Sequence, residues 1–256
     1  MKIAVIIVGR LEEAYQSFNL EMLEGCDIFI HTDSSYHTKA LEFNPKDITL
    51  TDSSYALTTV EGFYEGSVFK LAQQRLQQTI DKDTRYSKAN FSRIVQWKRL
   101  HEVFKKVNFT EYDFIIKWRD DLLKFEPEYP YAPHRFLNQI LKENGNLNNY
   151  ISSYAFEKEN IYCFKDLLFL FHSSKIHAVD VYNRINRYIC NQEDETWFNP
   201  ALLDLCDKGG KYNCARFEWI NSADRPFLYG FASETALILN CLVHNVPLKN
   251  IFRMLY

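Results

Sequence analysis

The chain lacks the long apolar runs that targeting and membrane segments require. The apolar run near its N-terminus, Ile3–Val8, has six residues and is too short for the core of a signal peptide. No stretch approaches the ~18 uninterrupted apolar residues of a membrane-spanning helix. We therefore expect an intracellular, cytoplasmic protein with no transmembrane segment, while a peripheral contact with a membrane stays open.

Cysteines at metal-binding or redox spacing are also absent. The six cysteines are spread along the chain without a C-x-x-C pair, at Cys26, Cys163, Cys190, Cys206, Cys214 and Cys241. In a chain of this size such spacing forms neither a zinc pattern nor a disulfide framework. We expect reduced thiols, most of them in the core.

The chain has no basic excess and no glycine-rich nucleotide loop. Its formal net charge is −3 and its basic residues are scattered, whereas proteins that bind nucleic acid normally carry a basic stripe. Gly9 stands alone, and no G-x-G-x-x-G or Walker A pattern occurs. The charge argues against nucleic acid as a partner, and the glycine pattern gives no phosphate-binding loop of either type.

An alternation of strand and helix patterns is present in the first half of the chain. The 256 residues suffice for one large α/β domain, and no repeat or linker divides them. The pattern gives a strand at Lys2–Arg10, a helix at Leu11–Leu23, strands at Cys26–Asp33 and Ile48–Thr51, a helix at Ser87–Val107 and a strand at Asp113–Trp118. A right-handed crossover would set the last strand parallel to its neighbours.

The remaining segments carry weaker patterns. Residues 34–66 are expected to be rich in loops, and residues 144–149 to form an exposed turn. We predict further elements at Ser67–Ile80 (helix), Phe136–Lys142 (helix), Ile161–His172 (one or two strands), Ser173–Tyr188 (helix), Tyr212–Ile220 (strand) and Ala232–Val243 (helix). His31 and His172 end strand-like runs without ligand spacing to other histidines, so we expect them to be hydrogen-bonded rather than metal-bound.

One motif combines an apolar strand with charge. The run Tyr112–Leu122 ends in Arg119, Asp120 and Asp121, and charged residues are rarely buried unless they are paired or liganded. Because ligands of open α/β sheets bind beyond the carboxyl ends of the strands, the three charges indicate a site at that edge. A strand that runs into an ordinary solvated turn is the competing interpretation.

Three predicted strands deliver polar residues to the same edge of the sheet. They bring together Gly9, Arg10, Thr32, Asp33, Arg119, Asp120 and Asp121. Arginines mixed with carboxylates suit a metal-bound phosphate ester, because Mg²⁺ or Mn²⁺ takes one or two carboxylates plus phosphate oxygens.

At these residues the sequence resembles the GT-A glycosyltransferases. The similarity is to surface-polysaccharide enzymes of the WavE-like lipopolysaccharide-synthesis kind and to comparable enzymes of large algal viruses. It rests on Ile3–Arg10, Arg93 with Gln96, Tyr112-Asp113 through Arg119-x-Asp121, Asp166-Leu167 and Glu234. Residues 1–125 carry most of it, and the usual D-x-D metal motif is replaced by Arg119-Asp120-Asp121.

The resemblance implies a GT-A-like, Rossmann-like fold. It would have a mostly parallel central sheet flanked by helices and a helical C-terminal part. Residues 1–256 would form one domain, with a nucleotide-sugar-binding part at about 1–125 and an acceptor-side part at about 126–256. The implied reaction transfers a sugar from a nucleotide-sugar donor to a hydroxyl of a saccharide or glycan acceptor, assisted by Mn²⁺ or Mg²⁺.

The resemblance also implies roles for individual residues. Glu234 would be the catalytic base, and Asp121 would act in catalysis as a metal ligand together with Asp120. The expected donor-binding residues are Gly9, Arg10, Asp33, Arg93, Gln96 and Arg119. In an extended chain Asp121 shares its face with Arg119 while Asp120 points away.

Several alternatives stay open at this point. An acid in the first turn of a helix also favours the macrodipole, so Glu234 could be structural, with Asp33 or Asp166 as the next candidate base. A nucleotidyltransferase with two metals and a non-catalytic sugar- or nucleotide-binding protein are the competing functions.

Overall fold

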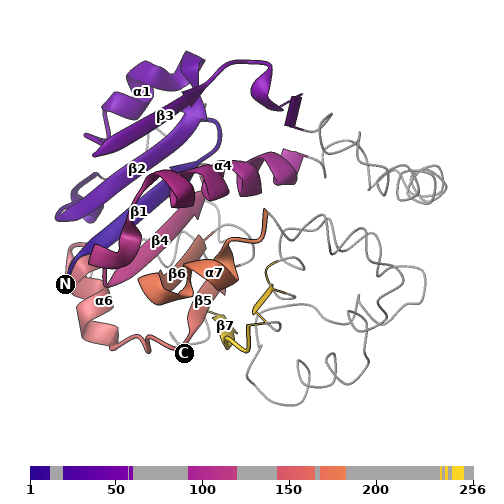
Figure 1. Ribbon diagram of the computed structural model, residues 1–256. Coiled ribbons are helices and arrows are strands. Elements are labelled where there is room, and N and C mark those ends of the chain that lie inside the picture. The colour runs from indigo at the N-terminus through magenta and orange to yellow at the C-terminus, as the bar shows by residue number, and fades with distance from the viewer. Residues whose placement is uncertain are drawn as a thin grey trace, which may run out of the picture.

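A seven-stranded sheet organises the protein (Figure 1). The computed structural model describes residues 1–11, 20–56, 58, 59, 92–119, 143–164, 168–182, 237, 240, 241 and 244–250. The strands are β1 Ile3–Val8, β2 Cys26–Asp33, β3 Asp47–Thr51, β4 Phe114–Arg119, β5 Ile161–Phe164, β6 Leu168–His172 and β7 Leu248–Asn250. The helices are α1 His37–Leu41, α4 Ser92–Lys106, α6 Leu147–Tyr154 and α7 Ile176–Val179, with 3₁₀ turns at Leu20–Leu23, Ser34–Tyr36, Phe109–Glu111 and Ser173–Lys175.

The strand order is β3-β2-β1-β4-β6-β5-β7. β1 pairs in parallel with β2 and β4, and β2 pairs in parallel with β3. β6 is antiparallel to both of its neighbours, β4 and β5, while β7 is parallel to β5. The predicted α/β class with a mostly parallel sheet is therefore confirmed, with one reversed strand in the second half.

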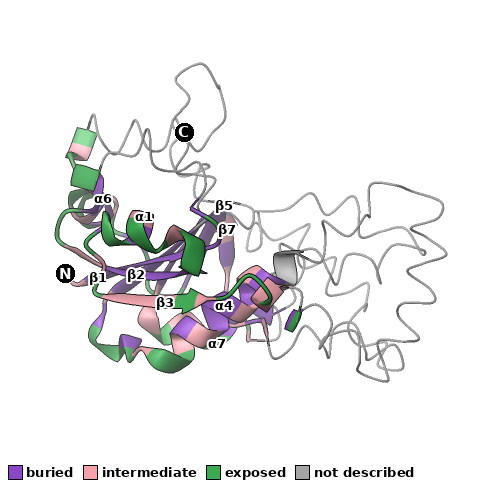
Figure 2. Ribbon diagram, turned by 90° about the horizontal axis from the view of Figure 1, so that it is seen from above, coloured by how far each residue is buried: buried purple, intermediate pink, exposed green. Residues whose placement is uncertain are grey.

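Apolar side chains cover both faces of the sheet, which explains the continuous hydrophobic run of β1. Ala4, Ile6 and Val8 face one core with α4 and α7, and the alternate residues of β1 face a second core with α1 and α6. Figure 2 shows these two helix pairs on opposite sides of the sheet. The architecture is thus a helix layer, a sheet and a second helix layer.

α4 packs over β1 and β2 and runs antiparallel to them. Arg99 at the middle of the helix contacts Asp33 at the end of β2, whereas Lys106, the last residue of the helix, lies 2.7 Å from the carboxylate of Asp47, where β3 begins. The N-terminal half of α4 therefore approaches the carboxyl ends of the strands. The crossover from β3 through α4 sets β4 parallel to β1, as predicted.

The exposed turn predicted at residues 144–149 is wrong in its second half. α6 begins at Leu147, so Asn148 and Asn149 lie in its first turn. The side chain of Asn146 accepts a hydrogen bond from the backbone N–H of Asn149 at 2.9 Å, which is N-cap geometry. The asparagines start a helix here because a cap satisfies a free backbone donor and the following residues are buried.

The helix predicted from Ser173 to Tyr188 is interrupted in its described part, and residues 183–188 lie outside the described residues. α7 ends at Val179, and Asp180 leaves helical geometry with ψ of 80°. The Asp180 carboxylate lies 2.8 Å from Nδ1 of His101 on α4, and this tertiary contact holds Asp180 outside the helix.

Other predictions have mixed outcomes. Ile161–His172 forms two strands, as allowed for, and β7 was not predicted. The predicted helices at 67–80 and 136–142 and the strand at 212–220 lie outside the described residues. In the part of the chain that the structure describes, no helix is long and apolar enough to cross a membrane.

Candidate functional site at the carboxyl edge of the sheet

β1 marks the point where the strand order reverses. The chain adds β2 and β3 on one side of β1 and then returns to place β4 on the other side. Val8, the last residue of β1, is in register with His31 on β2 and with Arg119 on β4. The turn at Gly9-Arg10 therefore begins beside Arg119, the last residue of β4, at the position where open α/β sheets bind ligands.

The turn after β1 is tied to β2. The backbone N–H of Gly9 donates to the carbonyl of His31 at 3.2 Å, and the hydroxyl of Thr32 donates to the carbonyl of Gly9 at 2.7 Å. Gly9 adopts a φ of 132°, which strains any residue with a Cβ. These bonds fix the direction in which the exposed Arg10 leaves the edge.

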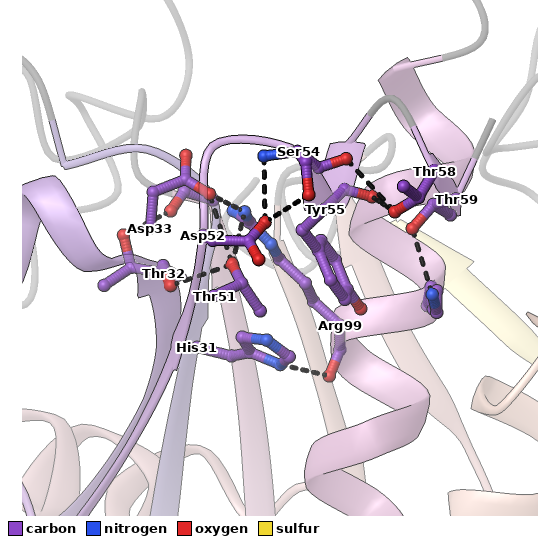
Figure 3. Close-up of polar contacts among 12 residues, drawn as sticks. His31, Thr32, Asp33, Thr51, Asp52, Ser54, Tyr55, Thr58, Thr59 and Arg99 are labelled. Atoms are coloured by element: carbon purple, nitrogen blue, oxygen red, sulfur yellow. Dashed lines mark hydrogen bonds and ion pairs between the residues drawn. The ribbon is translucent and has the colours of Figure 1, made fainter. Parts of the chain in front are cut away.

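Asp33, a predicted donor-binding residue, forms an ion pair with Arg99 (Figure 3). Nη2 of Arg99 donates to the carboxylate of Asp33 and to the hydroxyl of Thr51, the latter at 3.2 Å. The Thr51 hydroxyl also lies 3.2 Å from Oδ1 of Asp33. The side chain of Arg99 is 4% exposed and that of Asp33 is 19% exposed, so the pair presents its carboxylate side to solvent.

His31 lies beneath this ion pair and is fully buried. Its Nδ1 contacts the carbonyl of Arg99 at 3.2 Å, and its Nε2 is 3.6 Å from the carboxylate of Glu102. Burial, followed by the nearby Arg99 guanidinium, lowers the pKa of His31 from 6.5 to about 4. The ring is therefore neutral at neutral pH, and the predicted role as a hydrogen-bonded histidine is confirmed.

The described part of the edge does not fit a divalent cation. No group of three or more potential metal ligands occurs among the residues that the structure describes. Asp33 is already neutralised by Arg99. Asp120 and Asp121, the predicted metal ligands, lie outside the described residues.

The remaining predicted site residues divide into two groups. Gln96 is half-buried on α4, one turn before Arg99 and on the same flank, which places it nearer the edge. Arg93 lies in α4 and Arg119 ends β4, but their side chains are outside the described residues, as are Asp166 and Glu234.

Three residues of the network were not foreseen as site residues. Tyr55 and Glu102 hydrogen-bond to each other at 2.8 Å, and Arg99 pairs with Asp33. The sequence predicts only the helix Ser87–Val107, on which Arg99 and Glu102 lie. Nothing in the local pattern links position 99 to position 33.

Comparison with known proteins gives no relative: no family model matches the chain, and neither do curated proteins or solved structures.

Proposed function

We propose that the chain is a glycosyltransferase that moves a sugar from a nucleotide-sugar donor to a hydroxyl of a glycan acceptor. The observation that carries this proposal is the register of Val8 with Arg119 and His31 at the reversal of the strand order. It sets the turn at Gly9-Arg10 beside Arg119, which Asp120 and Asp121 follow in the sequence.

The proposed donor site lies along this edge. Arg10 and Arg119 would meet the diphosphate, because the planar guanidinium binds phosphate oxygens in pairs. Asp33, held by Arg99, would accept hydrogen bonds from hydroxyls of the nucleoside, as an acid at the end of a second strand does in dinucleotide-binding folds.

The reaction needs charge stabilisation at the leaving group and a base at the acceptor. The acceptor oxygen bonds to the anomeric carbon while the bond from that carbon to the diphosphate oxygen breaks, and the electron pair leaves with the nucleoside diphosphate. Arginines aimed at that oxygen stabilise the developing charge. Glu234 is the proposed base that takes the proton of the acceptor hydroxyl.

A metal is part of the proposal through residues outside the described set. Asp121, with Asp120, is the proposed ligand pair for Mn²⁺ or Mg²⁺. When bound, the cation supplies positive charge to the donor phosphates.

Donor binding and donor hydrolysis test the proposal together. Purified protein would be screened by thermal shift against UDP-, GDP- and dTDP-sugars with and without Mn²⁺, since a ligand that binds the folded state raises the melting temperature. Release of nucleoside diphosphate supports glycosyl transfer. Release of a sugar 1-phosphate would favour a nucleotidyltransferase, because attack on the phosphorus next to the nucleoside expels the sugar phosphate. Binding without release would favour a non-catalytic nucleotide-binding protein.

A further inference from the structure

The segment after β3 folds back onto α4. The carboxylate of Asp52 accepts hydrogen bonds from the N–H of Ser54 at 2.9 Å and from its hydroxyl at 2.6 Å. The N–H of Thr58 then donates to the carbonyl of Ser54 at 2.8 Å. These local bonds turn the chain so that Tyr55 lies over the helix (Figure 3).

Two residues of α4 lock Tyr55 in this position. The hydroxyl of Tyr55 donates to the carboxylate of Glu102 at 2.8 Å. Nζ of Lys98 lies 4.4 Å from the centre of the Tyr55 ring and donates to the hydroxyl of Thr59 at 3.0 Å. Lys98 and Glu102 are four residues apart, so they project from the same side of the helix.

The locked ring covers the Arg99 guanidinium. Cζ of Arg99 is 5.4 Å from the ring centre of Tyr55, within the range of a cation–π contact, and the His31 ring is 5.7 Å away. The hydrogen bonds of Arg99 to Asp33 and Thr51 both use Nη2. Nε of Arg99 is buried and has no acceptor among the described residues. Hydrogen bonds through one nitrogen do not by themselves fix the plane of the guanidinium, and the ring of Tyr55 packs against it.

We propose that Tyr55 is a positioning residue of the donor site, which fixes the Arg99 guanidinium so that Arg99 holds the Asp33 carboxylate at the edge of the sheet. This inference rests on the proposed function and extends it to a residue that does not touch the donor. Glu102 and Lys98 contribute to the same positioning, because they contact the hydroxyl and the ring of Tyr55.

Substitutions that remove one contact at a time test whether Glu102 acts on Arg99 through Tyr55. Tyr55→Phe keeps the ring and loses the hydrogen bond to Glu102, and Tyr55→Leu loses the ring as well. Glu102→Gln keeps an oxygen that accepts the tyrosine hydroxyl, whereas Glu102→Leu does not. Tyr112→Phe is the matched control, because Tyr112 is buried and donates to the Asp27 carboxylate at 2.7 Å near the opposite edge of the sheet.

The measurements are the hydrolysis kinetics of UDP-glucose, GDP-mannose and dTDP-glucose and the calorimetric affinity for UDP, GDP and dTDP. The loss of one hydrogen bond predicts a donor KM about 3- to 10-fold higher for Tyr55→Phe and Glu102→Leu. We expect a larger rise for Tyr55→Leu, with kcat within about twofold of the parent in all variants. Glu102→Gln should have the KM of the parent, because it keeps the acceptor oxygen. Tyr112→Phe should also have the KM of the parent but a lower melting temperature.

The outcomes separate this inference from the proposed function. If the parent binds a nucleotide and the Tyr55 and Glu102 variants bind it equally well, the positioning role is overturned and the function stands. Equal losses of kcat and affinity in Glu102→Gln and Glu102→Leu would also overturn it, because the rescue would have failed. If the parent neither binds nor hydrolyses any of these nucleotides, the proposed function falls and the positioning role falls with it.

Discussion

Arg99 is the residue on which the described half of the site depends. Its charged side chain projects from α4 and is almost completely buried, and Asp33 is its ion-pair partner. A buried charge that loses its partner costs far more than an exposed one, because it keeps its desolvation penalty. The loss of Asp33 should therefore destabilise the protein more than the loss of an exposed ion-pair partner.

Asp33→Asn is expected to lower the free energy of unfolding by about 3 kcal/mol, because Arg99 stays buried without a counter-charge. The double variant Asp33→Asn with Arg99→Met should regain part of that loss, since both charges are then absent. Urea denaturation measures the parent, the two single variants Asp33→Asn and Arg99→Met, and the double variant. The exposed pair of Asp47 and Lys106 provides the control, and Asp47→Asn should cost no more than about 1 kcal/mol. Additive losses in the double variant would contradict a coupled pair.

The low pKa of His31 predicts how the stability of the protein depends on pH. Its pKa is about 4 in the folded protein and 6.5 in the unfolded chain, so between these values the unfolded chain binds a proton that the folded protein excludes. Stability due to His31 is complete above pH 6.5 and falls as the pH drops towards 4, by about 3 kcal/mol at 1.36 kcal/mol per pKa unit.

Urea unfolding at several pH values between 7 and 4 should therefore show a shallower loss of stability in His31→Gln than in the parent. A variant of the exposed His37, His37→Gln, serves as the control and should follow the parent. Parallel curves for His31→Gln and the parent would show that another group controls this pH range.

Asp121 carries the metal part of the proposed function. Asp121→Asn keeps the size of the side chain but removes the charge that holds a hard cation. We expect the parent to bind its nucleotide sugar more tightly with Mn²⁺, and the variant to bind it equally with and without Mn²⁺. Calorimetric titration checks this, with circular dichroism to show that the fold survives. Metal-dependent turnover in the variant would remove Asp121 from the site.

At the scale of elements, α6 shows how a capping residue decides where a helix begins. Its first residue, Leu147, is buried, but two polar asparagines follow before the next buried residues, Tyr150 and Ile151, so periodicity alone gives a weak signal for the first turn. The bond from the N–H of Asn149 to the side chain of Asn146 satisfies one of the free donors at the helix start.

Asn146→Ala should therefore destabilise the protein by about 1 kcal/mol, and Asn146→Asp should retain most of the stability, because its carboxylate accepts the same bond. Thermal or urea unfolding of the two variants measures the difference. Ser152→Ala, on the same helix but away from its start, is the control. An equal loss for Ala and Asp at position 146 would exclude a capping role.

At the scale of the whole molecule, the central strands of the sheet are buried and the outermost strand β3 is partly exposed. All six residues of β1 are buried between two helix layers, whereas the residues of β3 at the edge are at least partly exposed. Stability against local opening follows such differences in burial.

Amide hydrogen exchange should reflect this arrangement. We expect β1 and β4 to exchange most slowly and β3 at least about tenfold faster, which corresponds to a difference of about 1.4 kcal/mol in the free energy of opening. Exchange followed by mass spectrometry of peptides from each strand measures the rates. Similar protection of β1 and β3 would mean that the sheet opens as one unit.

The sequence alone determined the elements of the sheet's first half and the edge at which a site could form. Strand length, apolar content and the polar residues that end Ile3–Val8, Cys26–Asp33 and Phe114–Arg119 are local properties, and parallel strands bring their carboxyl ends to one edge. The α/β class and the places of Gly9, Arg10 and Asp33 followed from them.

The tertiary structure decided which residues pair and which strand is reversed. Asp33 and Arg99 are 66 positions apart, and their contact exists because α4 crosses the ends of β2 and β3. The direction of β6 follows from its pairing with β4 and β5, which its own apolar run does not specify. The burial of His31 and the contacts of Tyr55 with α4 are also tertiary effects. They depend on which helix covers the end of β2, and the neighbouring residues in the sequence do not determine that.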